Sequence, residues 1–250
     1  MDASLCTLIT GASSGIGRAV AVRLSGERSL ILHGRDARRL DETLSMCANP
    51  ESHTAWRLDF SRVDQVAGSL SDLLESRDRA VESFVHCAGT TTVLPARRVD
   101  HHVAQESLNV NYISAVEIIN VLLRRKINDH RLANIVFISS IWSRFGARAH
   151  SAYCASKGAL DGFMRALAVE LAPGIRVNSI LPGAIQTPMA AEAFADPSIM
   201  EQLNRDYPMG LGEPANIADA VEFVLSARAR WLTGQQIIID GGRTVNMSLK

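Results

Sequence analysis

Tyrosine and lysine are both scarce in this sequence, and one of each lies where it could transfer a proton. The chain of 250 residues contains three tyrosines and three lysines, whereas arginine supplies nearly all of its positive charge. Tyr153 and Lys157 lie four positions apart in a helical pattern, which puts both on one helix face. A phenol titrates near pH ~10, and a neighbouring ammonium brings it closer to the range useful for acid–base catalysis. Considered alone, the pair could equally be a chance pairing on a solvated helix face.

A second candidate site is a glycine-rich turn. Gly11, Gly15 and Gly17 follow a short apolar run and precede a helical pattern. Glycines in such a turn let a pyrophosphate approach the backbone, and the amides that begin the helix face its negative charge. The spacing Gly-x3-Gly-x-Gly differs from the GxGxxG of many dinucleotide-binding folds, and glycines can also simply mark a turn.

The same turn matches the GxSxG motif of serine hydrolases, with Ser13 as the nucleophile. That fold needs several strands and an oxyanion loop before its nucleophile, and the position of Ser13 leaves no room for them. We therefore favour a nucleotide-binding turn over a hydrolase.

The elements that would position these residues follow an alternating pattern of short apolar runs and longer helical segments. Such alternation is typical of parallel strands joined by right-handed crossovers. We therefore predict an α/β fold, a Rossmann-like doubly wound parallel seven-stranded sheet with helices on both faces. The predicted strands span residues 5–10, 29–33, 54–59, 82–87, 133–140, 175–181 and 236–240.

The regular alternation fails in the segment 184–213, where no strand is predicted and three prolines break the pattern. A connection of that length inside a compact domain is usually a lid or a binding loop. We predict a single domain over 1–250 with a substrate lid at about 184–213. The apolar side chains that this lid offers to a substrate are Met189, Phe194, Met200, Tyr207 and Met209. Helical patterns begin near Gly15, Asp36, Arg62, Asp100, Ser151 and Pro214.

Composition excludes several classes of partner. The chain has 26 Lys and Arg against 26 Asp and Glu, and this net charge of zero argues against nucleic acid and anionic membranes as partners. The four cysteines are scattered without a CxxC pair, so we expect no metal site and no disulfide framework. With neither a signal sequence nor a long apolar run, we expect a soluble, cytoplasmic protein.

Several motifs in a fixed order carry a family resemblance. The chain resembles the single-domain branch of the short-chain dehydrogenase/reductase family over essentially its whole length, and is similar to 3-oxoacyl-[acyl-carrier-protein] reductases within it. One departure is His86-Cys87 before Ala88-Gly89, where the family commonly has two asparagines. We expect His86 to be a core residue rather than a catalyst. The segments that carry the resemblance are 10–17, 109–111, 139–140, 153–157, 181–187 and 232–242.

The resemblance implies a catalytic tetrad of Asn111, Ser140, Tyr153 and Lys157. Tyr153 would exchange a proton with the carbonyl oxygen, and Ser140 would stabilise the charge that develops there. Lys157 would bind the nicotinamide ribose and favour ionisation of the phenol. Asn111 would hold a water in a proton relay, unless it is only a polar cap within a helix.

The resemblance also implies an NAD(P) cofactor. Aligned on the family pattern, Gly34 takes the position of the acidic residue that selects NAD, and Arg35 follows it, which favours NADP. A slip of one residue would instead make Asp36 an NAD determinant. Asp59 would contact adenine, or alternatively cap the next helix. The implied cofactor-binding residues are Gly11, Ser13, Ser14, Gly15, Ile16, Gly17, Arg35, Asp59, Phe60, Ala88, Gly89, Tyr153, Lys157, Pro182, Gly183, Ile185 and Thr187.

We therefore expect an NADP(H)-dependent oxidoreductase that acts on a small-molecule carbonyl or secondary alcohol, with a 3-oxoacyl thioester among the candidate substrates. The alternatives are an NAD-dependent alcohol, sugar or steroid dehydrogenase and a non-catalytic nucleotide-binding regulator. The resemblance implies a homodimer or homotetramer, packed through apolar helices near 107–126 and 151–171. The basic segment 124–126 could meet an acidic carrier or simply be a solvated helix end.

Overall fold

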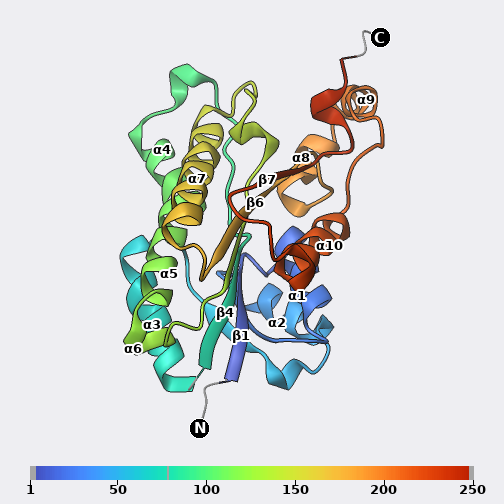
Figure 1. Ribbon diagram of the computed structural model, residues 1–250. Coiled ribbons are helices and arrows are strands. Elements are labelled where there is room, and N and C mark those ends of the chain that lie inside the picture. Colours follow the sequence, from blue (N-terminus) through green and yellow to red (C-terminus); the bar gives the residue numbers. More distant parts are fainter. Residues whose placement is uncertain (1–3, 78, 248–250) are drawn as a thin grey trace.

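Seven parallel strands form the centre of the protein. The computed structural model describes residues 4–77 and 79–247. The strands pair in the order β3-β2-β1-β4-β5-β6-β7, which confirms the predicted doubly wound sheet (Figure 1). Their bounds are Ser4–Thr10 (β1), Ser29–Gly34 (β2), Thr54–Arg57 (β3), Arg79–His86 (β4), Asn134–Ile138 (β5), Arg176–Pro182 (β6) and Gln236–Ile239 (β7).

The strand order reverses between β1 and β4. The chain passes from β1 outward to β3 and then returns to pair β4 on the other side of β1. Thr10 and His86, the last residues of these two strands, are register partners. Crossovers therefore leave in opposite directions from this point, and ligands of open α/β sheets bind in the crevice that this creates.

Helices cover both faces of the sheet. In Figure 1, α3 to α7 lie on the left of the sheet, and α1, α2 and α10 lie on its right, with α8 and α9 above them. The bounds are Gly15–Leu24 (α1), Ala37–Met46 (α2), Val66–Arg77 (α3), His101–Leu108 (α4), Ser114–Leu122 (α5), Arg125–Asn128 (α6), Ser151–Glu170 (α7), Ala191–Phe194 (α8), Pro197–Asp206 (α9) and Pro214–Leu225 (α10).

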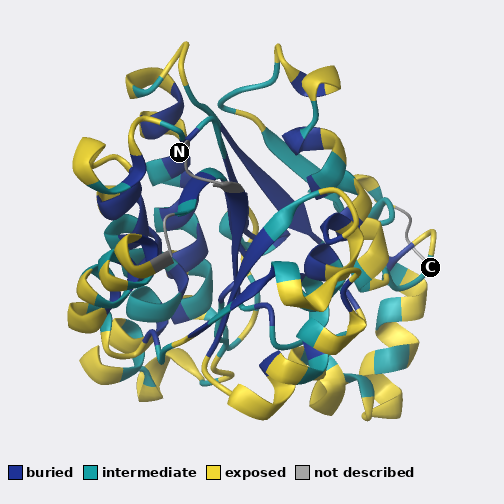
Figure 2. Cartoon of the chain, turned by 90° about the horizontal axis from the view of Figure 1, so that it is seen from below, coloured by how far each residue is buried: buried dark blue, intermediate teal, exposed yellow. Residues whose placement is uncertain are grey.

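Two apolar cores lie on opposite sides of the sheet because successive strand residues point to opposite faces. Phe84 and Phe137 are fully buried in the core beneath α3, α5 and α7. Their neighbours Val85 and Val136 belong to the second core, beneath α1, α2 and α10. Figure 2 shows the resulting pattern, in which buried strands are surrounded by helices with exposed outer faces.

Several predicted boundaries were wrong, among them the start of the fourth strand, which is at Arg79 rather than at 82. The third strand ends at Arg57 rather than at 59, since its partner β2 ends at Gly34. The fifth strand ends at Ile138, so that Ser139 and Ser140 lie beyond the sheet. The helix expected near Arg62 begins with a 3-10 turn, and α3 itself starts at Val66.

The predicted lid is more ordered than a loop. It contains α8 and α9, and its two ends are joined by a parallel bridge between Ile185 and Gly212. Tyr207, predicted to face the substrate, is instead buried, and its hydroxyl accepts a hydrogen bond from the Ala184 amide at 2.9 Å. Because that bond fixes the backbone after β6, Tyr207 anchors the segment 184–213.

The four cysteines are free thiols. Within residues 4–77 and 79–247, no three His, Cys, Asp or Glu side chains gather in a way that could hold a metal ion. No helix in the described part of the chain is long and apolar enough to cross a membrane.

Candidate active site

The glycine turn after β1 is packed so closely that glycine is required at its key positions. Gly11 has φ +65°, and a Cβ atom there would lie 2.7 Å from the backbone nitrogen of Ala88. A Cβ at Gly17 would collide with the carbonyl oxygen of Gly11. Gly15 has φ +52°, and its Cβ would lie 3.1 Å from Cγ2 of Thr187. These contacts bring the turn, the loop after β4 and the start of the segment 184–213 together.

A cavity of about 520 Å³ lies against this turn. Helix α1 begins at its wall, and in the described structure Ser14 makes no side-chain capping bond to the first turn of α1. Those amides are therefore available to an anion, as a dinucleotide pyrophosphate requires. Many of the predicted cofactor-binding residues line the cavity: Gly11, Ser13, Ser14, Gly15, Ile16, Gly17, Arg35, Asp59, Phe60, Ala88, Gly89 and Thr187.

The remaining predicted cofactor residues do not border this cavity in the described structure. Ile185 is buried in the core beneath α10. Gly183 lies so close to Tyr207 that a Cβ atom there would be 2.9 Å from its ring. Pro182 ends β6 and is buried, and Tyr153 and Lys157 belong to α7.

His33 is a cavity residue that sequence reasoning missed. Its Nδ1 accepts a hydrogen bond from the Gly11 amide at 3.4 Å, and its Nε2 donates to the Leu58 carbonyl at 3.0 Å. Its ring stacks on Phe60 with centroids 3.7 Å apart. Burial lowers the pKa of His33 to about 3, so that the ring stays neutral and can make both bonds. His33 thus joins the glycine turn to the segment after β3.

Asp59 closes a turn and does not cap a helix, because the next helical turn begins at Val63 with Arg62 as its N-cap. Its Oδ1 accepts a hydrogen bond from the Ser61 amide at 2.9 Å, and that bond lowers the pKa of the carboxyl. The side chain therefore closes the turn that leads toward α3, while the residue also lies on the cavity wall.

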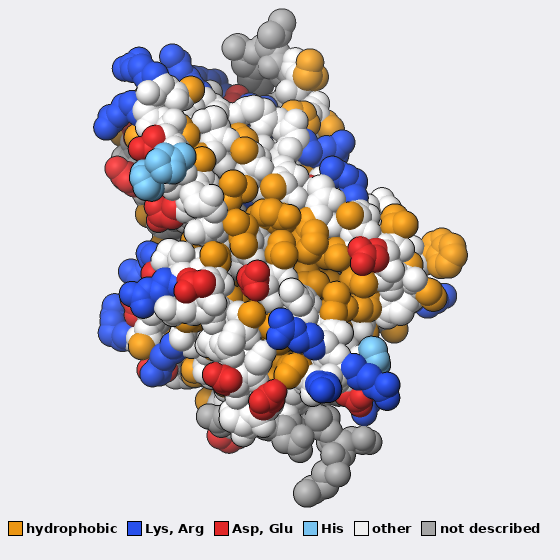
Figure 3. Space-filling model, turned by 90° about the vertical axis from the view of Figure 1, so that its left-hand side faces the viewer, with side chains coloured by type: hydrophobic (Ala, Val, Ile, Leu, Met, Phe, Trp, Pro, Cys, Tyr) orange, Lys and Arg blue, Asp and Glu red, His pale blue; other side chains and the backbone are white. Residues whose placement is uncertain are grey.

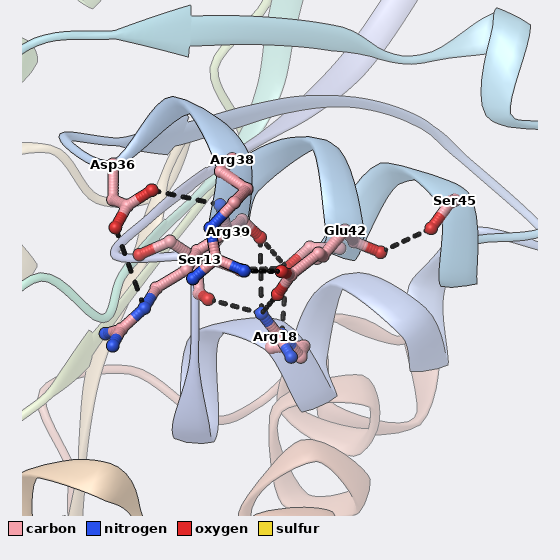
Figure 4. A network of polar contacts seen from close by, with 9 residues as sticks. Ser13, Arg18, Asp36, Arg38, Arg39, Glu42 and Ser45 are labelled. Atoms are coloured by element: carbon pink, nitrogen blue, oxygen red, sulfur yellow. Dashed lines mark hydrogen bonds and ion pairs between the residues drawn. The ribbon is translucent and has the colours of Figure 1, made fainter.

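The end of β2 presents arginines to the cavity. Arg35 and Arg39 both line it. Asp36 caps α2 by accepting a hydrogen bond from the Arg39 amide at 3.0 Å, and this bond lowers the pKa of its carboxyl (Figure 4). Arg38 pairs with Glu42 at 2.8 Å. The carboxylate that could have selected NAD is therefore engaged in capping, and Arg39 is a second cation that sequence reasoning missed.

His86 braces the two central strands in place of the family's asparagines. Its Nδ1 accepts a hydrogen bond from the Thr10 hydroxyl at 2.9 Å, and the same hydroxyl accepts one from the Ala88 amide at 3.2 Å. Burial is the largest influence that lowers the pKa of His86 to about 3. The expectation that His86 is a core residue agrees with these contacts, and they link the end of β1 to the loop after β4.

Asn111 clamps that same loop. It lies in the π-helical turn Asn109–Ile113 between α4 and α5, an irregularity often found at functional sites. Its Oδ1 accepts from the Thr90 amide at 2.7 Å, and its Nδ2 donates to the Thr90 carbonyl at 3.0 Å and to Ser156 at 2.8 Å. The side chain is therefore more than a helix cap, because it ties the loop after β4 to α7.

Tyr153 and Ser140 meet at the start of α7. Ser140 Oγ accepts a hydrogen bond from the Trp142 amide at 3.2 Å. Burial raises the pKa of Tyr153 to about 12, although Ser140 opposes this shift. The expectation that Lys157 lowers the phenol pKa was therefore wrong for this structure, because desolvation of the phenolate dominates.

Lys157 lies behind the tyrosine. Its Nζ is 5.9 Å from the centre of the Tyr153 ring and donates to the Ile138 carbonyl at 2.8 Å. A Cβ atom at Gly89 would lie 3.5 Å from this Nζ and 3.4 Å from Oδ1 of Asn111. Burial lowers the pKa of Lys157 to about 8. The structure thus brings Asn111, Ser140, Tyr153 and Lys157 together beside the cavity.

Asp161 is a further residue that sequence reasoning missed. It lies one helical turn after Lys157, is 2% exposed, and neither of its carboxylate oxygens has a hydrogen-bond partner among the described residues. Its negative charge raises the pKa of Lys157 and so opposes the effect of burial. The sequence shows that an aspartate lies four positions after Lys157, but it does not show that this aspartate is buried.

The chain is similar to several known proteins. The family profile described as "Enoyl-(Acyl carrier protein) reductase" matches residues 11–244. L-xylulose reductase from Bos taurus is 31% identical, with 94% of each chain covered. (3R)-3-hydroxyacyl-CoA dehydrogenase from Homo sapiens is 30% identical, covering 96% of this chain and 95% of that one.

Solved structures share the fold. A 4-hydroxyisoleucine dehydrogenase mutant in complex with NADH and succinate superimposes with a TM-score of 0.89 at 25% identity, covering 97% of this chain and all (100%) of that one. A candidate 2-deoxy-d-gluconate 3-dehydrogenase from Agrobacterium tumefaciens with bound NADP gives 0.87 at 26% identity, with 98% of each chain covered.

Fold and site together define a dinucleotide-binding α/β protein with a serine, tyrosine and lysine beside its cofactor cavity. The chain belongs to the short-chain dehydrogenase/reductase family. It is therefore an NAD(P)-dependent oxidoreductase that acts on CH–OH and C=O groups.

The buried His86 should make the protein sensitive to acid. Its pKa in the folded chain, about 3, is below the ordinary value of 6.5. As the pH falls through 6.5, this histidine binds a proton in the unfolded chain but not in the folded chain. The free energy of unfolding therefore decreases until the pH reaches about 3. At about pH 5 the loss is ~2 kcal/mol for one such histidine. We expect His86→Asn to lose less stability than the parent between about pH 7 and pH 5 in urea denaturation.

The control is His130→Asn, which replaces an exposed histidine and should keep the slope of the parent. His33 contributes to the parent's slope in the same direction and is unchanged in both variants. If His86→Asn and the parent lost the same free energy, the neutral buried state of His86 would be wrong.

Proposed function

We propose that the protein reduces a small-molecule ketone to a secondary alcohol with NADPH. The observation that carries this proposal is the position of Tyr153, whose ring lies 5.9 Å from Lys157 Nζ beside the cavity and whose pKa is raised to about 12 by burial. At neutral pH this phenol keeps its proton. A protonated acid beside the cofactor cavity is the form that carbonyl reduction requires.

Each residue of the tetrad has a defined task in this proposal. Tyr153 donates its proton to the substrate oxygen, and Ser140 hydrogen-bonds the same oxygen as negative charge develops there. The Lys157 ammonium donates one hydrogen bond to the Ile138 carbonyl, and it binds the nicotinamide ribose with its remaining N–H groups. Asn111 positions the loop after β4 through two hydrogen bonds with Thr90.

The cavity residues suit a dinucleotide. The glycine turn and the free amides of α1 hold the pyrophosphate, while Ala88 and Gly89 let the loop after β4 approach the adenosine ribose. Thr187 and the start of the lid cover the other side of the cavity. When bound, the nicotinamide supplies the hydride.

Two arginines favour NADP over NAD. Arg35 and Arg39 line the cavity at the end of β2, where the adenosine 2′-position lies in this fold. Arg guanidinium groups match phosphate oxygens in geometry and charge. The contacts of Asp36 also favour NADP. Its carboxylate, which could otherwise bind the ribose hydroxyl of NAD, accepts a hydrogen bond from the Arg39 amide at the start of α2.

The substrate side is suited to apolar groups. Trp142 lies against the Tyr153 ring at 6.0 Å and against His150 at 4.4 Å, and Met189 of the lid reaches the cavity. The names of the relatives suggest a ketose or a 3-oxoacyl thioester as the substrate. We include both within the proposal.

We also propose that the protein is a homodimer or homotetramer. An apolar band crosses the middle of the face formed by α4, α5 and α7 (Figure 3). Exposed apolar side chains on these elements include Val169, which is 81% exposed at the end of α7, and Leu123, which is 39% exposed just after α5. Exposed apolar surface of this kind marks association sites, and a second copy of the same face is the simplest partner.

The Tyr153→Phe variant tests the proposed chemistry. It removes the acidic proton and leaves the ring, so we expect turnover of NADPH with carbonyl substrates to fall ~100-fold or more. NADPH binding, followed by nicotinamide fluorescence, should persist. Tyr112→Phe is the matched control, because Tyr112 packs against Phe163 rather than beside Ser140. Unchanged turnover in Tyr153→Phe would rule out the proposed acid.

The Arg35→Asp variant tests the cofactor. Losing a charge-assisted hydrogen bond to phosphate should weaken NADPH binding ~10- to 100-fold, whereas NADH binding should stay the same or improve. Arg38→Ala is the control, since the Arg38 guanidinium is paired with Glu42. Equal affinity of parent and Arg35→Asp for NADPH would contradict the assignment.

Light scattering tests the assembly. We expect a mass of two or four chains for the parent. Val169→Glu should lower that mass, because it buries a charge in the proposed contact, and it should spare the fold, since the side chain is exposed. Met46→Glu, at an exposed position on α2, should leave the mass unchanged. A parent of one chain would refute the proposed assembly.

A further inference from the structure

Arg18, in the first turn of α1, joins the glycine turn to α2. Its guanidinium donates hydrogen bonds to the Ser13 carbonyl at 2.7 Å and to the Arg39 carbonyl at 3.2 Å (Figure 4). Its Nε donates to the hydroxyl of Thr43 at 3.0 Å. In the described structure Arg18 is not one of the residues that line the cavity, whereas Ser13 and Arg39 both line it. One side chain outside the cavity therefore connects two parts of its wall.

Thr43 holds the preceding carbonyl of the same turn. Its side chain is fully buried, and its hydroxyl donates to the Ala12 carbonyl at 2.9 Å while it accepts from Arg18. The carbonyls of Ala12 and Ser13 are therefore held by Thr43 and Arg18 respectively. Because carbonyl oxygens carry partial negative charge, binding them in this way keeps them away from the phosphates of a dinucleotide. The amides at the start of α1 remain as the groups that those phosphates meet.

The Arg18 guanidinium also fixes the start of α2. The Arg39 carbonyl that it binds belongs to a residue whose side chain lines the cavity. Asp36 accepts a hydrogen bond from the amide of the same residue at 3.0 Å. Both polar groups of the Arg39 backbone are thus bound, and one of these bonds comes from Arg18. The Arg39 side chain therefore leaves from a backbone position that is fixed relative to the glycine turn.

The spacing of these two parts of the wall matters for NADP. Its pyrophosphate and its 2′-phosphate are separated by a single adenosine, so the distance between them varies little. A protein binds both phosphate groups at once, without a cost of rearrangement, only if its two sites are already held at a matching distance. NAD has no 2′-phosphate, so it depends on the glycine turn but not on this spacing.

The ion pair of Arg18 does not account for the choice of arginine. Arg18 pairs with Glu42 at 3.3 Å, but the two side chains are 27% and 43% exposed, and ion pairs this accessible contribute little. Glu42 also pairs with Arg38 at 2.8 Å, so that it has a second cationic partner. The hydrogen bonds to the turn and to α2 instead require a planar group that donates in several fixed directions at once, which arginine has and lysine lacks.

We infer that Arg18 is a positioning residue, which holds the glycine turn and the start of α2 at the spacing that lets NADP bind through both of its phosphate sites. This inference rests on the proposed use of NADP. It assigns part of the preference for NADP to a residue outside the cavity. When Arg18 is lost, the two sites are no longer held together, so NADPH loses more affinity than NADH does.

The variant Arg18→Met tests the inference, because it removes the guanidinium and keeps an unbranched apolar stem. We expect the Kd of NADPH, followed by nicotinamide fluorescence, to rise ~10- to 100-fold, and that of NADH to rise less than ~5-fold. The ratio of the two dissociation constants is the decisive readout. A general loosening of the fold would raise both constants by the same factor.

Arg18→Lys separates charge from geometry. It keeps the positive charge but loses the planar group, so we expect it to recover little of the lost discrimination between NADPH and NADH. Full recovery would assign the effect to charge and overturn the inference.

Thr43→Val is a second test that leaves Arg18 in place. It removes the hydrogen bond to the Ala12 carbonyl, and it should shift the ratio in the same direction by a smaller factor. This variant keeps the inference falsifiable if Arg18→Met does not fold. An unchanged ratio in Thr43→Val would contradict the role given to the turn carbonyls.

Arg23→Met is the matched control on the same helix. The Arg23 guanidinium donates to Glu222 at 2.9 Å and lies 3.3 Å from Asp219, so it joins α1 to α10 and does not contact the glycine turn. Both dissociation constants should stay within ~2-fold of those of the parent.

A double-variant cycle tests the placement of Arg39. If Arg18 positions Arg39, then Arg39→Ala should weaken NADPH binding less in the Arg18→Met background than in the parent. Additive losses would overturn the inference, as would equal losses for NADPH and NADH in Arg18→Met or an unchanged affinity for NADPH. A parent that binds neither nucleotide would instead refute the proposed function, and a parent that prefers NADH would refute the proposed cofactor. Both of these failures appear in the parent, before any variant is compared.

Discussion

The close approach of the glycine turn to the end of β4 is the constraint on which this site depends. No Cβ atom fits at Gly11, because the backbone of Ala88 lies against it. No Cβ atom fits at Gly17 either, because the carbonyl oxygen of Gly11 occupies that place. This packing is possible only where β1 and β4 are adjacent, which is the point where the strand order reverses. The same contact therefore fixes α1 for the cofactor phosphates and the loop after β4 for the catalytic side.

Buried side-chain hydrogen bonds then extend that constraint to α7. His86 and Thr10 hold the start of the loop after β4, and Asn111 holds Thr90 two residues beyond Ala88. Asn111 also bonds Ser156, which precedes Lys157. The loop after β4 therefore contacts both the cavity and the four residues of the tetrad. A shift of this loop would displace both.

The sequence predicted the parts that depend on local pattern. Strand alternation and the spacing of Gly11, Gly15 and Gly17 indicated the fold and the turn, and the i,i+4 spacing placed Tyr153 with Lys157. Contacts between distant segments could not be predicted in this way. His33 and Arg39 gave no signal of their own, because their importance comes from Leu58, Phe60 and the cavity, which folding brings to them. The phenol pKa was misjudged for the same reason, since burial follows from packing and not from spacing.

Burial of the tetrad also bears on the direction of the reaction. Desolvation favours the neutral phenol of Tyr153 and weakens the ammonium of Lys157. The proposed reduction begins from the protonated phenol, which is the form that burial favours. Oxidation would need the phenolate, which the same burial disfavours. The carboxylate of Asp161 raises the pKa of Lys157 and so offsets part of the effect of burial on the ammonium. Since neither oxygen of Asp161 has a hydrogen-bond partner among the described residues, this charge interaction is what offsets part of the cost of burying the carboxylate.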